Sequence, residues 1–147
     1  TGKTYLFKLL LEGKKNSLAL TFINALVADL SLELCGLADV RTLHGFARSV
    51  LHTKKTPIKV APKLKLVLTR DAELLLGEKI DFDEVLYRLD YKHKHLAFYK
   101  ARREFYDHFG HTDLIFSAVD RFRAGTLAVP KFELVLVDEY QDFNPLE

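Results

Sequence analysis

The end of the chain carries the stretch that most constrains its fold. The run Leu134–Val137 is wholly apolar, and it stops abruptly at the carboxylates of Asp138 and Glu139. Continuous apolar runs of this length are typical of strands buried on both faces of a parallel sheet. Ligands of open α/β sheets bind beyond the carboxyl ends of the strands. The pattern therefore predicts a parallel sheet with Asp138 and Glu139 at its functional edge.

The two carboxylates suggest divided chemical roles. Asp138 suits a hydrated Mg²⁺, because proteins hold this hard cation with one or two carboxylates together with substrate phosphates. Glu139 is placed to orient or deprotonate an attacking water. An ordinary strand followed by an acidic turn is the alternative, and this stretch alone leaves both interpretations open.

The beginning of the chain carries a complementary pattern. Its first residues, T-G-K-T, match the last part of the phosphate-binding loop G-x-x-x-x-G-K-[ST]. In that pattern Gly2 lets the backbone approach a phosphate, Lys3 reaches the β- and γ-phosphates, and the hydroxyl of Thr4 ligates Mg²⁺. The helix expected after them offers free N–H groups to an anion. The tripeptide G-K-T is common by chance. It indicates a phosphate-binding loop only together with the distant pair of carboxylates.

Two further blocks lie between these ends. T-F-x-N at residues 21–24 and T-x-H-x-F at residues 42–46 each stand where a strand gives way to a helix. Together with D-E-x-Q-D at residues 138–142, they resemble the ATP-binding motor domain of the UvrD/Rep family of superfamily 1 DNA helicases. The first two blocks are similar to motifs Ia and Ib of that family, and the acidic block is specific to it. All stand in the family's order.

The resemblance implies an α/β fold, a RecA-like P-loop NTPase sheet flanked by helices, with a helical insertion before the Walker B strand. Residues 1–52 would form the first part of the 1A core, residues 53–107 a helical 1B-like insertion, and residues 108–147 the return to the core. The strand before the phosphate loop, motifs III to VI and the second RecA-like domain are not in the sequence, so we expect a truncated domain. Residues 1–147 alone are expected to show no helicase activity and at most trace ATPase.

The resemblance also implies the ligands and the site residues. ATP and Mg²⁺ would be the cofactors, and single-stranded DNA and the second RecA-like domain, with its arginine finger, the partners. For catalysis, the resemblance implies Glu139 as the general base and Gln141 as the sensor of the γ-phosphate. It implies Gly2, Lys3 and Thr4 for nucleotide binding, and Thr4 and Asp138 for Mg²⁺. It implies Phe22, Asn24 and His44 as contacts to DNA. For the DNA contacts the structural alternatives are a core phenylalanine, a turn-forming asparagine and a helix-capping histidine. For Gln141 the alternative is a solvated turn residue.

The sequence departs from the family at two places. Ala25 stands where the family usually has lysine, and Gly45 where it usually has serine. Both lie in motifs that touch DNA, so they leave open a non-catalytic DNA-binding or scaffold module. The intact Lys3, Asp138 and Glu139 favour a motor instead. A helicase domain within a helicase–nuclease recombination enzyme, or within a phage or plasmid protein, is a further alternative.

Composition narrows the class of protein. Hydrophobic residues make up 48% and charged residues 29% of the chain, which is ordinary for a globular domain. A formal net charge of +2 is too small to indicate nucleic-acid binding, so any basic patch must be local. The single cysteine, Cys35, is expected to be a small core residue in a reducing, cytoplasmic compartment. No apolar run is long enough to predict a membrane span.

The order of elements follows from hydrophobic periodicity and turn residues. We expect strands at 17–21, 38–42 and from 134, helices at 4–11, 24–35, 43–51, 63–76, 82–109 and 113–122, and a linker at 54–57. A basic, aromatic cluster at 91–95 and 100–103 suggests either phosphate contacts or a solvated helix face, and the second is favoured. His93 and His95 would point to different faces of the long helix, which argues against a metal site.

Overall fold

The structure is a computed structural model, and it describes residues 2–52 and 57–147. The chain folds into two units. The sheet unit comprises the chain up to Phe46 together with Ala128–Phe143, and the helical unit comprises Ala47–Leu127 together with Asn144–Glu147. Most of the predicted linker at 54–57 lies outside the described residues.

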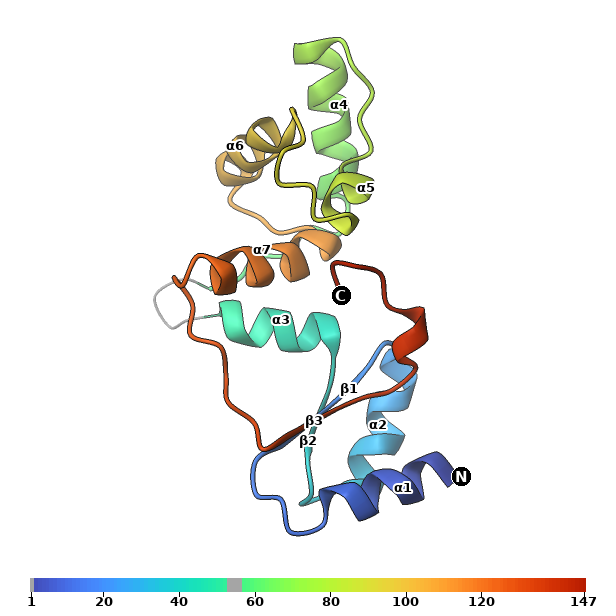
Figure 1. The fold of residues 1–147 in the computed structure, drawn as a ribbon. Helices are drawn as coiled ribbons and strands as arrows, with labels where there is room; N and C mark the ends of the chain where they lie inside the picture. Colours follow the sequence, from blue (N-terminus) through green and yellow to red (C-terminus); the bar gives the residue numbers. More distant parts are fainter. Residues whose placement is uncertain (1, 53–56) are drawn as a thin grey trace. The chain divides into compact units, whose positions relative to one another are not determined.

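The sheet unit is built on three parallel strands. β1 (Ser17–Thr21) lies between β2 (Asp39–Thr42) and β3 (Leu134–Val137). Two helices, α1 (Gly2–Leu11) and α2 (Asn24–Glu33), flank the strands (Figure 1). The prediction of an α/β fold with a parallel sheet flanked by helices is therefore confirmed, and β1 has the bounds expected from its apolar run.

One face of the sheet forms the core of this unit. Ala19 of β1 lies opposite Val40 of β2 and Leu136 of β3, so the three side chains form a row on the same face. Leu11 at the end of α1 and Leu34 just after α2 pack on this row, and both are fully buried. Other partly buried residues packed against the cluster are Phe7, Leu37, Ala38 and Leu134. This packing fixes α1 and the end of α2 against the sheet.

The carboxyl ends of the three strands meet at one edge. Thr21 lies opposite Thr42 in the register of β1 and β2. The N–H of Asp138 donates a hydrogen bond of 2.8 Å to the carbonyl of Leu20, which carries the ladder one residue past β3. Asp138 therefore lies on the same edge as the ends of β1 and β2, as the sequence predicts. α3 (Leu43–Leu51), which has its predicted bounds, follows β2 from this edge.

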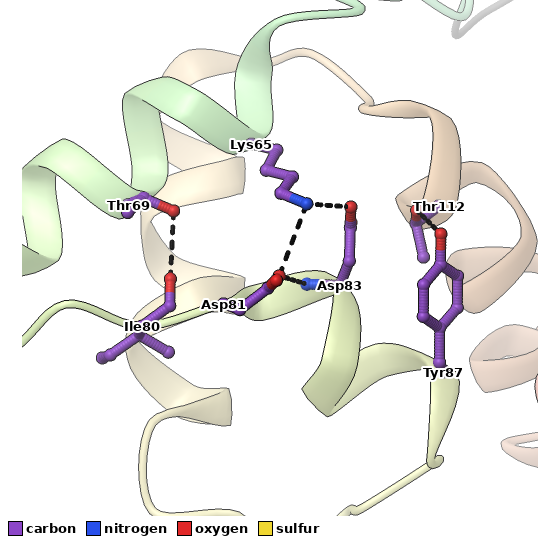
Figure 2. A network of polar contacts seen from close by, with 7 residues as sticks. All are labelled: Lys65, Thr69, Ile80, Asp81, Asp83, Tyr87 and Thr112. Carbon is purple, nitrogen blue, oxygen red and sulfur yellow. Dashed lines mark hydrogen bonds and ion pairs between the residues drawn. The ribbon is translucent and has the colours of Figure 1, made fainter.

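The helical unit contains α4 (Leu64–Leu76), α5 (Phe82–Tyr87), α6 (Leu96–Tyr106) and α7 (His111–Arg123). Polar contacts tie α4 to α5, and α5 to α7, as Figure 2 shows. Lys65 forms ion pairs with Asp81 and with Asp83 at the start of α5, and Asp81 caps that helix by accepting the N–H of Asp83. The side chain of Lys65 thus holds α4 against the start of α5.

The single helix predicted at 82–109 is wrong, because the structure has α5 and α6 with a turn between them. Leu89 adopts a left-handed backbone with φ of 52°, and the carboxylate of Asp90 accepts the N–H of Lys92 at 3.1 Å. Short polar side chains that bond a nearby N–H in this way compete with helix formation. The apolar face predicted for the long helix is still buried, at Phe82, Leu86, Leu96 and Tyr99, but on two helices.

The expectation for His93 and His95 was also wrong. Both belong to the turn before α6, and their ring centroids lie 5.6 Å apart instead of facing opposite ways. The backbone nitrogen of His95 lies 3.3 Å from Nδ1 of His93. Nε2 of His95 lies 2.9 Å from a carboxylate oxygen of Glu78. The argument from helical geometry fails because the helix does not extend through these residues.

Cys35 is exposed, so its prediction as a core residue is wrong. α2 ends at Glu33, two residues earlier than expected. At Leu34 the backbone leaves the helix, with φ of −103° and ψ of 17°. Leu34 then occupies the core position, and its neighbour Cys35 is left at the surface.

A buried carboxylate in α7 predicts an unusual dependence of stability on pH. Asp113 is 2% exposed, and burial raises the pKa of its carboxyl to about 6, although Arg103 at 3.9 Å and the hydroxyl of Ser117 act in the opposite direction. Because the pKa of Asp113 is higher in the folded than in the unfolded protein, protonation of its carboxyl stabilises the fold. This stabilisation is complete below the unfolded pKa and is lost as pH rises through about 6. The penalty at neutral pH is on the order of 3 kcal/mol.

Asp113→Asn is expected to remove this pH dependence, because the amide cannot ionise. Denaturant unfolding of both proteins checks it: the stability of the variant relative to the unaltered protein should rise by roughly 3 kcal/mol between about pH 4 and pH 7. Parallel stability curves across this range would show that the carboxyl of Asp113 titrates normally in the folded protein.

Within the described part of the chain, no helix combines the length and the apolar character that crossing a membrane requires.

Candidate functional site

Lys3 meets Asp138 and Glu139 at the carboxyl edge of the sheet. Lys3, in the first turn of α1, places its Nζ 3.1 Å from Oδ1 of Asp138. The same ammonium forms an ion pair with the carboxylate of Glu139, a residue 136 positions away in the sequence. The structure therefore brings together the cation and the two carboxylates that the sequence singles out.

A pocket of about 310 Å³ opens beside this ion pair. Its polar wall consists of Lys3, Thr4, Asp138 and Glu139, and its apolar wall consists of Phe7, Leu26 and Leu30 from α1 and α2. A single open volume thus faces three of the residues predicted to bind nucleotide or Mg²⁺, together with Glu139, the predicted general base. Polar groups that converge on a partly apolar cleft are typical of small-molecule sites.

Asp138 is the most enclosed charge at the site. Its side chain is 8% exposed, whereas those of Lys3 and Glu139 are 49% and 38% exposed. Its Oδ1 lies near the ammonium of Lys3 but accepts no hydrogen bond of good geometry from residues 2–52 or 57–147. Buried polar atoms without a partner are uncommon in native proteins. This oxygen therefore has coordination capacity left for a cation, which fits the role predicted for Asp138.

The charges at the site stabilise one another. The hydrogen bond to Glu139, and then the nearby carboxylate of Asp138, raise the pKa of Lys3 above its ordinary value. The ammonium of Lys3, followed by the amide of Gln141, lowers the pKa of Glu139 below its ordinary value. Glu139 is therefore held as a carboxylate at neutral pH, which is the form needed to accept a proton from water.

Glu139 also has a strained backbone. Its φ of 52° and ψ of 43° lie in the left-handed region, which few residues other than glycine adopt. The short helix η1 (Tyr140–Asp142) follows it, and the amide of Gln141 donates a hydrogen bond back to Oε2 of Glu139. Such conformations cost roughly 1–3 kcal/mol and cluster at functional sites. Gln141 thus clamps the carboxylate of Glu139, a role that sequence reasoning missed.

Gly2 and Thr4 lie in the first turn of α1. α1 thus begins two residues earlier than the helix predicted at 4–11, and Thr1 lies outside the described residues. A Cβ atom on Gly2 would meet no atom of the described residues within 4 Å. The backbone at Gly2 is therefore open to an approaching ligand.

The residues predicted to contact DNA follow β1 and β2 at the same edge. Phe22 is 46% exposed, so the alternative of a core phenylalanine is excluded. Asn24 is the exposed first residue of α2, and His44 is half-buried in the first turn of α3. Because Thr21 and Thr42 pair across the strands, the residues that follow them start from neighbouring points on this edge.

The departure at Gly45 has a local structural reason. Its N–H donates a hydrogen bond of 3.0 Å to Oγ1 of Thr42, which satisfies one of the free donors at the start of α3. A Cβ atom at position 45 would lie 3.1 Å from that same oxygen, which is tighter than ordinary contact. A serine here would have to displace Thr42, so the glycine and the threonine cap belong together. The structure gives no comparable reason for Ala25.

The basic cluster of the helical unit is largely neutralised by partners. Arg102 pairs with Asp71 at 2.6 Å, Lys100 pairs with Asp120 at 2.9 Å, and Lys94 pairs with Glu78 at 3.0 Å. These ion pairs offset much of the positive charge that the cluster would offer to a phosphate. The solvated helix face, which the sequence already favoured, is the better interpretation.

Two aromatic residues at the sheet edge were not singled out from the sequence. The ring of Phe143 lies edge-on to Phe22, with centroids 5.8 Å apart, and 6.2 Å from the ring of Tyr140. Tyr140 is 74% exposed. Their only signal in the sequence is their place inside and just after the acidic block, which sequence reasoning assigned to nucleotide chemistry alone.

Comparison of the chain with protein-family models, with curated proteins and with solved structures finds no significant match. In the described ranges, no group of three or more His, Cys, Asp or Glu side chains is arranged to hold a metal ion. Mg²⁺ bound through one carboxylate, a hydroxyl and substrate phosphates does not require such a group.

Proposed function

We propose that this chain is the nucleotide-binding part of an ATP-dependent DNA helicase of the UvrD/Rep type, which couples ATP hydrolysis to movement along single-stranded DNA and to strand separation. The observation that carries the proposal is the position of Lys3 beside Asp138 and Glu139, at the carboxyl edge of a parallel sheet. A phosphate-loop lysine and a strand-end pair of carboxylates have no local reason to meet. A shared ligand, a nucleoside triphosphate with its cation, explains why both patterns occur.

The ion pair suggests how the site exchanges partners. The ammonium of Lys3 pairs with both carboxylates and offsets one of their two negative charges. Thr4 and Asp138 would hold Mg²⁺, which would supply positive charge to the carboxylates and to the charge that develops on the phosphates. Lys3 would then be free to contact the β- and γ-phosphates, and Glu139 to accept a proton from the attacking water.

The clamp from Gln141 completes the arrangement. Once Lys3 moves to phosphate, the amide of Gln141 is the remaining contact that orients the carboxylate of Glu139. Because this amide lies two residues after Glu139, in the short helix that Glu139 directly precedes, a displacement of η1 moves base and clamp together. We propose that the second RecA-like domain acts on this turn and supplies the arginine that stabilises the transition state.

For DNA, the exposed ring of Phe22 supports base stacking in a single strand. Phe22→Ala is expected to weaken binding of single-stranded DNA to the full-length protein about 5- to 100-fold, with little dependence on sequence, because stacking on a ring contributes about 1–3 kcal/mol per base. Fluorescence anisotropy with single-stranded and duplex oligonucleotides of equal length measures this, and the single strand should bind more tightly. The affinity should also fall with added salt.

Thermal melting of Phe22→Ala provides the control. If the variant melts at a lower temperature and binds single-stranded DNA unchanged, then Phe22 serves packing against Phe143 only. If duplex binds as tightly as the single strand, the proposed movement along one strand loses its basis.

A further inference from the structure

An exposed aromatic surface lies next to Glu139 and the short helix η1 that follows it. It consists of Phe22, which follows β1, and of Tyr140 and Phe143 at the two ends of η1. Phe143 contacts both other rings, at 5.8 Å and 6.2 Å between centroids, whereas Phe22 and Tyr140 are 46% and 74% exposed. Phe143 therefore supports two rings that present much of their area to solvent. We refer to these three residues as the aromatic edge.

The charges around the aromatic edge select the type of occupant. Tyr140 lies between Glu139 and the clamping Gln141, and the exposed Asp142 follows. The carboxylates of Glu139 and Asp142 repel a phosphate group that has no cation beside it, which disfavours the sugar–phosphate backbone on the ring of Tyr140. An uncharged, flat nucleobase avoids that repulsion and gains stacking energy on the ring. Only unpaired bases expose their faces in this way, because the bases of a duplex are already stacked.

We propose that Tyr140 is a base-stacking residue for single-stranded nucleic acid and that a base stacked on it positions Glu139 for hydrolysis. The proposal rests on the proposed function and extends it to a residue with no assigned role. Tyr140 directly follows the left-handed backbone of Glu139 and directly precedes the amide that clamps its carboxylate. A base on the ring of Tyr140 therefore restrains the same short segment that holds the general base. Strand binding then raises the fraction of molecules whose Glu139 is correctly oriented.

The main test compares Tyr140→Ala with Tyr140→Phe in the full-length protein. Tyr140→Ala is expected to weaken binding of single-stranded DNA about 5- to 100-fold, while Tyr140→Phe keeps the affinity, because the ring face carries the interaction. The slope of log affinity against log salt concentration should be the same in all three proteins, since no phosphate contact is removed. The stimulation of ATP hydrolysis by saturating strand should fall in Tyr140→Ala and persist in Tyr140→Phe.

Phe105→Ala is the matched control, because Phe105 of α6 is a ring of similar exposure, 71%, and belongs to the helical unit instead of the sheet unit. It should change neither strand affinity nor stimulation. Melting temperatures should stay close to that of the unaltered protein, because exposed side chains contribute little to stability.

The outcomes separate this inference from the proposed function. If the unaltered protein hydrolyses ATP with strand stimulation and Tyr140→Ala behaves identically, the inference is overturned. A reduced salt slope in Tyr140→Ala would also overturn it, by showing a phosphate contact. If the unaltered protein neither binds nucleotide nor responds to DNA, the proposed function itself fails. A loss in Tyr140→Ala that Tyr140→Phe restores supports the inference.

Discussion

Replacing Glu139 by glutamine is expected to lower the rate of ATP hydrolysis by the full-length protein about 100- to 10,000-fold, because general base catalysis contributes that much. Binding of Mg²⁺–ATP should not weaken. Lys3 pairs with Glu139 in the structure, so removing that carboxylate frees the ammonium for phosphate, while Asp138 remains for the cation. Steady-state kinetics gives the rate, and calorimetry with a non-hydrolysable ATP analogue gives the affinity.

Asp138→Asn is the matched control for this experiment. Asp138 is the enclosed carboxylate with an oxygen left for coordination, so its amide should weaken the dependence of nucleotide binding on Mg²⁺. If Glu139→Gln and Asp138→Asn lose nucleotide binding equally, the two carboxylates do not have the separate roles assigned to them.

Lys3→Ala should weaken binding of Mg²⁺–ATP by about 10- to 100-fold, since a hydrogen bond to a charged group contributes about 1.5–3 kcal/mol. The mutation also leaves the enclosed carboxylate of Asp138 without its nearest cation. Because Lys3 lowers the pKa of Glu139, the pKa of that carboxyl should rise in the variant. The acidic limb of the pH–rate profile should therefore move to higher pH, to whatever extent activity remains measurable.

Lys8→Ala distinguishes this loss from a general loss of positive charge. Lys8 lies on the same helix as Lys3, but it pairs with the exposed Glu33 of α2 and does not line the pocket. Its removal should leave nucleotide affinity unchanged. Equal effects of Lys3→Ala and Lys8→Ala would mean that Lys3 acts only through net charge.

The sequence predicts the sheet well, because the information is local. The apolar composition of the run before Asp138 and of residues 17–21 is enough to predict both as strands. In the structure, β1 pairs with β2 and β3 in a parallel sheet. The motifs also place Lys3, Asp138 and Glu139 at the boundaries of a strand or helix. What the motifs do not contain is the pairing of Lys3 with both carboxylates or the left-handed backbone at Glu139, because these depend on how distant segments pack.

The wrong predictions arise at single turns that end or divide a predicted helix. The left-handed Leu89 and the side-chain contact of Asp90 divide a predicted helix, and the positions inferred for His93 and His95 fail with it. The end of α2 at Glu33 likewise moves Cys35 from the core to the surface. Periodicity shows which residues are buried, but it does not show where a short polar side chain stops a helix. The aromatic edge was missed for another reason, since Tyr140 lies within a block already assigned to nucleotide chemistry.

The central claim is that the pocket beside Lys3, Asp138 and Glu139 binds a nucleoside triphosphate together with Mg²⁺. Calorimetric titration of the full-length protein with a non-hydrolysable ATP analogue, with Mg²⁺ and then with a chelator, tests it most directly. The account predicts saturable binding at one site that weakens when Mg²⁺ is removed and when Lys3 is replaced by alanine. Absence of binding, or binding that neither Mg²⁺ nor Lys3→Ala affects, would contradict it.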